Sequence, residues 1–173
     1  EQNVREVKEI VELAHALGIS VEAELGHVGM ADQYETDGSA ALTEPETAAE
    51  FIRLTGVDCL AVAVGTAHGA YPKGMKPKLD FERLVAIKKK TGHFPLVMHG
   101  SSGTDNETLR KACRMGINKV NIANDLCQAA AKAAKTADLE GNHAYDFSAV
   151  VYEAVKAKMK EMIEVYGSVG KAG

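Results

Sequence analysis

The sequence has 173 residues, 46% of them hydrophobic and 25% charged, which suits one folded domain and excludes a disordered chain. The formal net charge is −4, and the one basic run, residues 88–90, falls at an expected helix end, so we expect no nucleic-acid partner. No apolar run approaches the roughly 20 residues of a membrane span. The charged opening EQNVREVKE predicts no signal peptide, and cysteines without CxxC spacing suit free thiols in a reducing cytoplasm.

One order of elements repeats along the chain: an amphipathic helix, a glycine that ends it, and an apolar strand. Apolar residues recur with a period of 3.6 from Val4 to Leu17, and the strand ISVEAELG follows Gly18. A capping box of Thr43 and Glu46 is expected to begin the second helix, which leads into the strand VDCLAVAVG.

The next two units have the same form. Asp80 is expected to cap a helix that leads into the strand FPLVMHG. Thr104 and Glu107 make a second capping box, before a helix that leads into the strand INKVNIAN. A helix over residues 125–135 and a long terminal helix over residues 147–163 are expected to complete the chain.

Strands that alternate with helices predict an α/β protein with a parallel sheet, and apolar residues on both strand faces predict that both faces are covered. The two architectures that fit are a doubly wound sheet and a (β/α)8 barrel. In both, ligands bind at the carboxyl ends of the strands. The polar residues Glu24, His68, His99 and Asn121 fall at these ends.

Two histidines, His68 and His99, each end an apolar run and are each followed by a glycine, Gly69 and Gly100. Neutral imidazole is a good zinc ligand, and a glycine lets backbone amides approach a ligand closely. The two histidines can meet only if their strands are neighbours. The alternative for each is a strand-end histidine that hydrogen-bonds a carbonyl.

Two further segments carry polar groups at the same ends. The loop HGSSGT, residues 99–104, can present N–H groups and a helix dipole to an anion such as phosphate, or can be a plain turn. Asn121 is expected inside an apolar strand, as a structural bridge or a ligand contact, because it would be costly to bury without partners.

Acidic residues are the remaining candidates. Glu24 ends the first strand, and its alternative is a salt bridge to a lysine or arginine. The polar loop MADQYETDGSA follows and contains Asp32, Glu35 and Asp37, any of which could transfer a proton. A solvated acidic loop is the alternative for all three.

Several motifs together resemble a known family. They are VEAELGHVG, TGVDCLAVAVGTAHGAY, PKLDFERL, PLVMHGSSG and GINKVNIANDL, and they cover nearly the whole chain in order. They resemble the class II, zinc-dependent ketose-bisphosphate aldolases, the fructose- and tagatose-bisphosphate aldolase family. The resemblance implies a (β/α)8 barrel of which this chain covers about strands 5–8 and the C-terminal helices. It also implies cleavage of a ketose 1,6-bisphosphate to dihydroxyacetone phosphate and glyceraldehyde 3-phosphate.

The resemblance also implies roles for individual residues. His68 and His99 correspond to two of three zinc-binding histidines, and Glu24 to the acid that can hold the metal in an alternate position. Glu35, with Asp32 as second choice, matches the proton-transfer acid of the mobile loop. The positions that match the family's triose-phosphate contacts are Gly69, Gly100, Ser102, Asn121, Ala123, Asn124 and, after an intervening Pro72, Lys73. In the family, carbonyls near these two glycines often hold a monovalent cation, so the resemblance also implies Na⁺ or K⁺.

One family motif is absent from the sequence. The third zinc histidine and the acid/base aspartate belong to a His-x-Asp-His motif that the 173 residues do not contain. We therefore expect residues 1–173 to be the C-terminal half of one barrel domain, completed by an absent N-terminal half or by a complementary chain. A half-barrel would expose sheet edges and apolar helix faces, so a homodimer or higher oligomer is expected. The alternative is a non-catalytic assembly subunit that retains the phosphate-binding loop.

Overall fold

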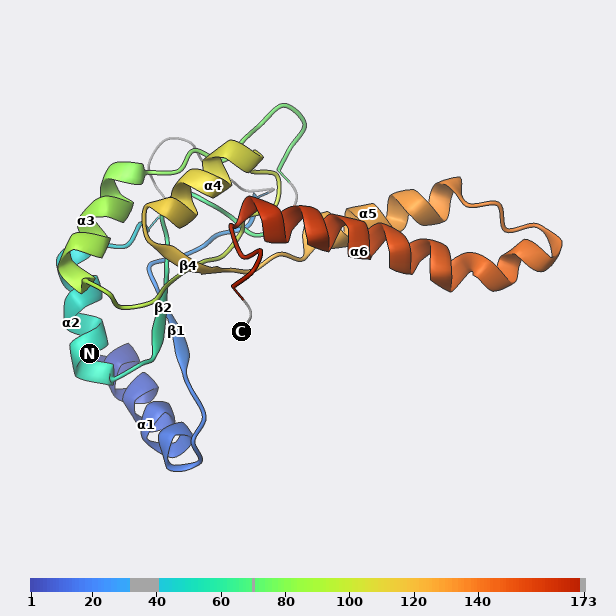
Figure 1. Cartoon of the computed structure of the whole chain (residues 1–173). Helices are drawn as coiled ribbons and strands as arrows, with labels where there is room; N and C mark the ends of the chain where they lie inside the picture. Colours follow the sequence, from blue (N-terminus) through green and yellow to red (C-terminus); the bar gives the residue numbers. More distant parts are fainter. Residues whose placement is uncertain (32–40, 70, 172–173) are drawn as a thin grey trace.

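The computed structural model describes residues 1–31, 41–69 and 71–171. Within them, four strands form one parallel sheet, each strand is preceded by a helix, and a helical pair follows (Figure 1). The elements are α1 (Gln2–Ala16), β1 (Glu22–Leu25), α2 (Pro45–Thr55), β2 (Cys59–Val62), α3 (Phe81–Thr91), β3 (Leu96–Met98), α4 (Asn106–Arg114), β4 (Ile117–Val120), α5 (Asn124–Thr136), the 3-10 helix η2 (Gly141–Asp146) and α6 (Phe147–Val165).

The strand order distinguishes the two expected architectures. Strands β1, β2, β3 and β4 lie side by side in chain order, and every pairing is parallel. A doubly wound sheet reverses its order at a switch point, whereas a (β/α)8 barrel adds each strand next to the previous one. The observed order is that of a barrel segment.

The two faces of the sheet have different surroundings. Leu60, Val62, Leu96 and Met98 are fully buried and share one hydrophobic cluster with residues of helices α2, α3, α4 and α6. Because side chains alternate along a strand, the residues between them point to the opposite face. On this opposite face, the expected apolar residues are present on β2 and β3. On the outer strands, β1 and β4, glutamates and a lysine occupy it instead. We call it the polar face.

A β-bulge between β3 and β4 determines which residues of β4 reach the polar face. Leu96 pairs with Ile117, but Val97 pairs with Lys119, so Asn118 is the extra residue. The Asn118 side chain accepts a hydrogen bond from the Leu96 N–H at 3.1 Å. The bulge thereby places Lys119 beside Val97, which is the position that Asn118 would hold in an unbroken ladder.

Both predicted capping boxes are wrong, whereas the Asp80 cap is confirmed. Asp80 accepts from the Arg83 N–H at 2.9 Å. The Thr43 hydroxyl instead bridges strands, donating to the Leu25 carbonyl and accepting from the Ala63 N–H. Asp105, not Thr104, caps α4, since its carboxylate accepts from the Thr108 N–H at 2.9 Å.

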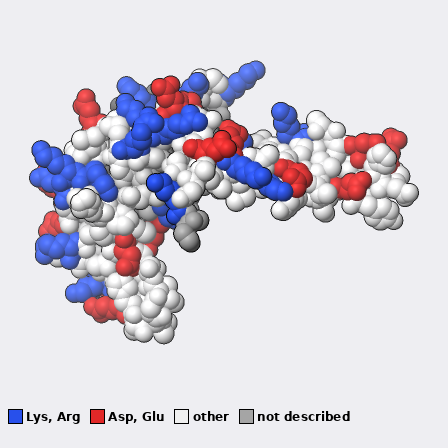
Figure 2. Space-filling view, in the orientation of Figure 1, with Lys and Arg blue, Asp and Glu red and all other residues white. Residues whose placement is uncertain are grey.

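The last two helices, α5 and α6, extend beyond the rest of the chain. Helices α5 and α6 pack against each other and project away from the sheet as a long hairpin (Figure 1). Large apolar side chains are exposed on this hairpin and on α1 with its C-cap, among them Ile10, Leu13, Leu17, Tyr152 and Met159. Positive and negative side chains are mixed over the face in Figure 2. Within the described ranges, no helix is long and apolar enough to cross a membrane.

Candidate metal centre

Three side chains from neighbouring units meet at the carboxyl ends of the strands. Glu24 comes from β1, and His99 directly follows β3. His68 lies in the loop after β2, where its N–H donates to the Gly29 carbonyl and its own carbonyl accepts from the Ala31 N–H, each at 2.7 Å. These backbone bonds pair the loops after β1 and β2, and so hold His68 beside the end of β1.

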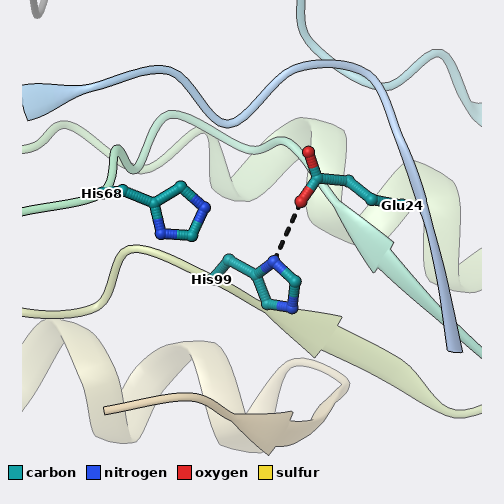
Figure 3. A group of neighbouring side chains, drawn as sticks. All are labelled: Glu24, His68 and His99. Atoms are coloured by element: carbon teal, nitrogen blue, oxygen red, sulfur yellow. Dashed lines mark hydrogen bonds and ion pairs between the residues drawn. The ribbon is translucent and has the colours of Figure 1, made fainter. Parts of the chain in front are cut away.

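The donor atoms of Glu24, His68 and His99 lie within 4.8 Å of one another (Figure 3). The two imidazole rings are 5.6 Å apart between centroids and tilted by 48°. The Glu24 carboxylate lies 2.9 Å from His99 Nδ1. Glu24 therefore meets a histidine, and not the lysine or arginine of the alternative that the sequence left open.

The register of the sheet explains how Glu24 reaches His99 across an intervening strand. Glu24 pairs with Ala61, and Ala61 pairs with Val97, two residues before His99. Paired residues of a parallel sheet point to the same face, and Ala61 carries only a methyl group there. The short side chain leaves room above β2 for the glutamate and the imidazole to meet.

Two charged residues of this network, Glu22 and Lys119, are not among the candidates that the sequence indicated. Glu22 Oε1 lies 2.9 Å from His99 Nε2, and Glu22 Oε2 accepts from Lys119 Nζ at 2.7 Å. Partial burial favours a raised pKa for Glu22, but hydrogen bonds from Lys119 and His99 outweigh it, so the pKa lies below the ordinary value. The sequence does carry a signal for both residues. Glu22 is two residues before Glu24, Lys119 is two residues before Asn121, and residues two apart on a strand point to the same face.

The loop after β3 is tied to its neighbours on both sides. The Thr66 hydroxyl donates to the His99 carbonyl at 2.6 Å, and the Ser101 hydroxyl donates to the Asn121 carbonyl at 2.8 Å. Gly100 has φ 66°, and a Cβ there would lie 2.5 Å from the Ala67 carbonyl. Glycine is thus required where the two histidine-bearing loops touch.

The two helix starts near this loop differ in what they can offer an anion. At α4, the Asp105 carboxylate already accepts from the Thr108 N–H and adds a negative charge, which makes this helix start less favourable for an anion. At α5, the N-cap residue is Ala123, which makes no side-chain cap, so N–H groups of the first turn are left for another acceptor. Burial raises the pKa of Asp125 in that turn, although the Gly103 N–H and nearby Lys158 oppose the rise.

The remaining predicted site residues have the following places. Ser102 is buried, with 5% of its surface exposed, and Gly69 and Asn124 are partly buried. Asn121 is exposed rather than buried, which corrects the expectation, and its Oδ1 accepts from Lys119 Nζ at 3.0 Å. Lys73 is exposed in the turn after Tyr71. Glu35 and Asp32 lie outside the described residues.

Comparisons with known proteins identify the family. The family model of class-II fructose-bisphosphate aldolase matches residues 1–171. The chain belongs to the class II fructose-bisphosphate aldolase family. It is 42% identical over 173 residues to the protein YdjI of Escherichia coli K12, described as uncharacterized, with 99% of this chain and 60% of YdjI covered.

Solved structures support the fold. The crystal structure of the YdjI aldolase from E. coli K12 superimposes with a TM-score of 0.80 at 37% identity, covering 99% of this chain and 57% of that one. A fructose-1,6-biphosphate aldolase candidate from Coccidioides immitis gives 0.83 at 31%, covering 99% and 60%. A Campylobacter jejuni fructose-bisphosphate aldolase gives 0.77 at 22%, covering 96% and 57%. The α/β barrel fold is confirmed, and the chain spans about three-fifths of the length of these relatives.

The chemistry of the donor set suits the metal that the family implies. Zinc accepts imidazole nitrogen and carboxylate oxygen, and a catalytic zinc keeps three protein ligands and an open position. Glu24 and His99 are partly buried, whereas His68 is exposed, so the group faces solvent on one side. Two nitrogens and one carboxylate can therefore bind an ion and leave a side accessible to substrate.

Proposed function

We propose that this chain provides the metal-binding and phosphate-binding part of a zinc-dependent aldolase that cleaves or condenses a ketose 1,6-bisphosphate, fructose or tagatose. The products of cleavage would be dihydroxyacetone phosphate and glyceraldehyde 3-phosphate. The observation that carries the proposal is the convergence of Glu24, His68 and His99 at the carboxyl ends of three neighbouring parallel strands. In barrel enzymes, the active site lies at that end.

In this proposal, His68 and His99 hold the zinc ion together with a third histidine, and Glu24 can hold it in an alternate position. The bound ion would supply Lewis-acid polarisation of the substrate ketone. Glu35, or Asp32 as second choice, transfers the proton at the triose carbon. The third zinc histidine and the acid/base aspartate come from an N-terminal half or a complementary chain. Residues 1–173 then form the C-terminal half of one barrel domain in a cytoplasmic homodimer or higher oligomer.

The triose phosphate is assigned to the loop after β3 and the start of α5. Gly69, Gly100 and Ser102 would offer backbone amides, and Asn121 would contact the triose. Ala123 and Asn124 would add amides of α5, whose first turn has no side-chain cap. Lys73 would add charge at the rim, and carbonyls near the glycines could hold Na⁺ or K⁺. This phosphate binding is remote from the reacting carbons, so its energy can orient the substrate.

The alternative is a non-catalytic subunit that keeps the fold and the phosphate loop and acts in assembly. The exposed apolar residues of α1 and of the α5–α6 hairpin are compatible with it. A pure assembly role, however, gives no reason for three metal-type ligands to converge at the catalytic end of the sheet. The enzyme proposal accounts for the converging ligands and also for the exposed apolar residues, since an incomplete barrel must associate to bury its apolar surface.

The test is complementation. We expect the 173-residue chain alone to show no cleavage of fructose or tagatose bisphosphate with zinc. Mixing it with an N-terminal aldolase segment that carries the His-x-Asp-His motif should restore zinc-dependent cleavage, and His99→Ala should abolish the gain. A mixture that forms the complex by light scattering yet stays inactive, or a chain that is active alone, would refute the proposal.

A further inference from the structure

The imidazole of His99 lies between two carboxylates of one strand. Glu24 Oε2 is 2.9 Å from Nδ1, and Glu22 Oε1 is 2.9 Å from Nε2. Glu22 and Glu24 are two residues apart on β1, so both side chains project from the polar face, and they contact the ring from different sides. The two carboxylates are not equivalent, because only Glu24 also lies beside His68.

The orientation of the ring distinguishes the two nitrogens. In Figure 3, the His99 nitrogen bonded to Glu24 points toward the space shared with His68, and the other nitrogen points away from it. The first nitrogen, Nδ1, is therefore the one placed to bind a metal. A ring that binds a metal through Nδ1 must carry its proton on Nε2 and donate it to an acceptor. Glu22 is the acceptor at that position.

Glu22 is held in place by hydrogen bonds from neighbouring side chains. Its second oxygen, Oε2, accepts from Lys119 Nζ at 2.7 Å and from Cys59 Sγ at 3.6 Å. Lys119 Nζ also donates to Asn121 Oδ1 at 3.0 Å. Both oxygens of Glu22 are thus engaged, and the β4 bulge at Asn118 is what brings Lys119 onto this face.

We propose that Glu22 is the positioning residue of the metal centre: it accepts the Nε2 proton of His99 and so presents Nδ1 to a metal shared with His68 and Glu24, while Lys119 holds Glu22 in place. The inference rests on the proposed metal site and adds two residues to it. Outer carboxylates of this kind fix the tautomer and the orientation of a ligating histidine, and their loss costs about 10- to 100-fold in metal affinity.

The experiment uses the 173-residue chain and zinc alone. Zinc affinity is measured by competition with a chromophoric chelator in the wild type, in Glu22→Gln and in a matched control, Glu12→Gln, whose glutamate is exposed on α1. We expect Glu22→Gln to weaken zinc binding by about 10- to 100-fold and Glu12→Gln to leave it unchanged. ¹H–¹⁵N spectra of the zinc-bound wild type should show the His99 proton on Nε2, with Nδ1 bound to metal.

A second pair of variants keeps the proposal testable if Glu22→Gln fails to fold. Lys119 is 52% exposed at its side chain, so its replacement should be tolerated. Lys119→Met should weaken zinc binding, and Lys119→Arg, which keeps the charge, should restore most of it.

The outcomes distinguish failure of the Glu22 role from failure of the metal site itself. Loss of zinc binding in His99→Ala together with full affinity in Glu22→Gln, or a metal bound through Nε2, would overturn the role of Glu22 and leave the metal site standing. Full affinity in His99→Ala would overturn the metal site itself. Equal affinity in Lys119→Met and Lys119→Arg would remove Lys119 from the proposal.

Discussion

Replacement of Gly100 by alanine tests the contact between the two loops that carry the histidines. Gly100 directly follows His99 and has φ 66°, in the left-handed region. A Cβ built at this position lies 2.5 Å from both the carbonyl carbon and the oxygen of Ala67, the residue before His68. The obstacle is backbone rather than a flexible side chain, so the loops must move apart.

Two costs add at this position. An L-residue in the left-handed region costs about 1–2 kcal/mol relative to glycine. Insertion of a methyl group into a packed contact typically costs about 1–3 kcal/mol more, and Ala67 is 2% exposed, so the contact is packed. Gly100→Ala should therefore lower the free energy of unfolding by about 2–5 kcal/mol.

The chain offers a matched control, Gly18. Its φ is 71°, close to that of Gly100, but a Cβ there meets nothing within 4 Å. Gly18→Ala should cost only the backbone part, about 1–2 kcal/mol. Urea unfolding followed by circular dichroism measures both, and zinc affinity should fall in Gly100→Ala alone. Equal destabilisation by the two variants would refute the close approach of the loops.

Two further predictions concern helix starts. Ala123→Asp should cap α5 and stabilise the chain by about 0.5–2 kcal/mol, but its charge should weaken the binding of inorganic phosphate. Ala123→Ser should cap the helix without weakening phosphate binding. Calorimetry that shows the same phosphate affinity for both variants would contradict the assignment of the phosphate to this helix start. The Thr108 N–H holds the pKa of Asp105 below its ordinary 3.8, so its carboxylate stabilises the fold above that pH and less as pH falls through the folded-state pKa. The stability difference between wild type and Asp105→Asn in urea should therefore shrink on acidification, and a difference independent of pH from neutral to strongly acidic solution would refute this cap.

The sequence predicted the order of elements and the residues at strand ends because these depend on local patterns. Helix periodicity and terminating glycines such as Gly56 act within a few residues, and parallel strands bring their carboxyl ends together by topology alone. The meeting of His68 and His99, 31 residues apart, followed from that topology. The expected role of each residue does not follow from local patterns and rests on the resemblance to the aldolase family.

The errors arose where tertiary contacts override local rules. Thr43 has the spacing of a capping residue, but its hydroxyl is used between β1 and β2 instead. The part played by Lys119 depends on a bulge, and one inserted residue exchanges the two faces of a strand without a clear sequence signal. Glu24 matches a motif position of the aldolase family and Glu22 does not, although the two residues share a strand face.

Zinc titration of the chain and of its single-histidine variants tests the central claim most directly. The account predicts one zinc ion per chain, bound more weakly than nanomolar because Glu24, His68 and His99 are the three ligands that converge in the described part of the chain. Binding should be lost in His68→Ala and in His99→Ala and retained in His143→Ala, whose histidine lies in η2. Equal zinc affinity in all four proteins would contradict the account.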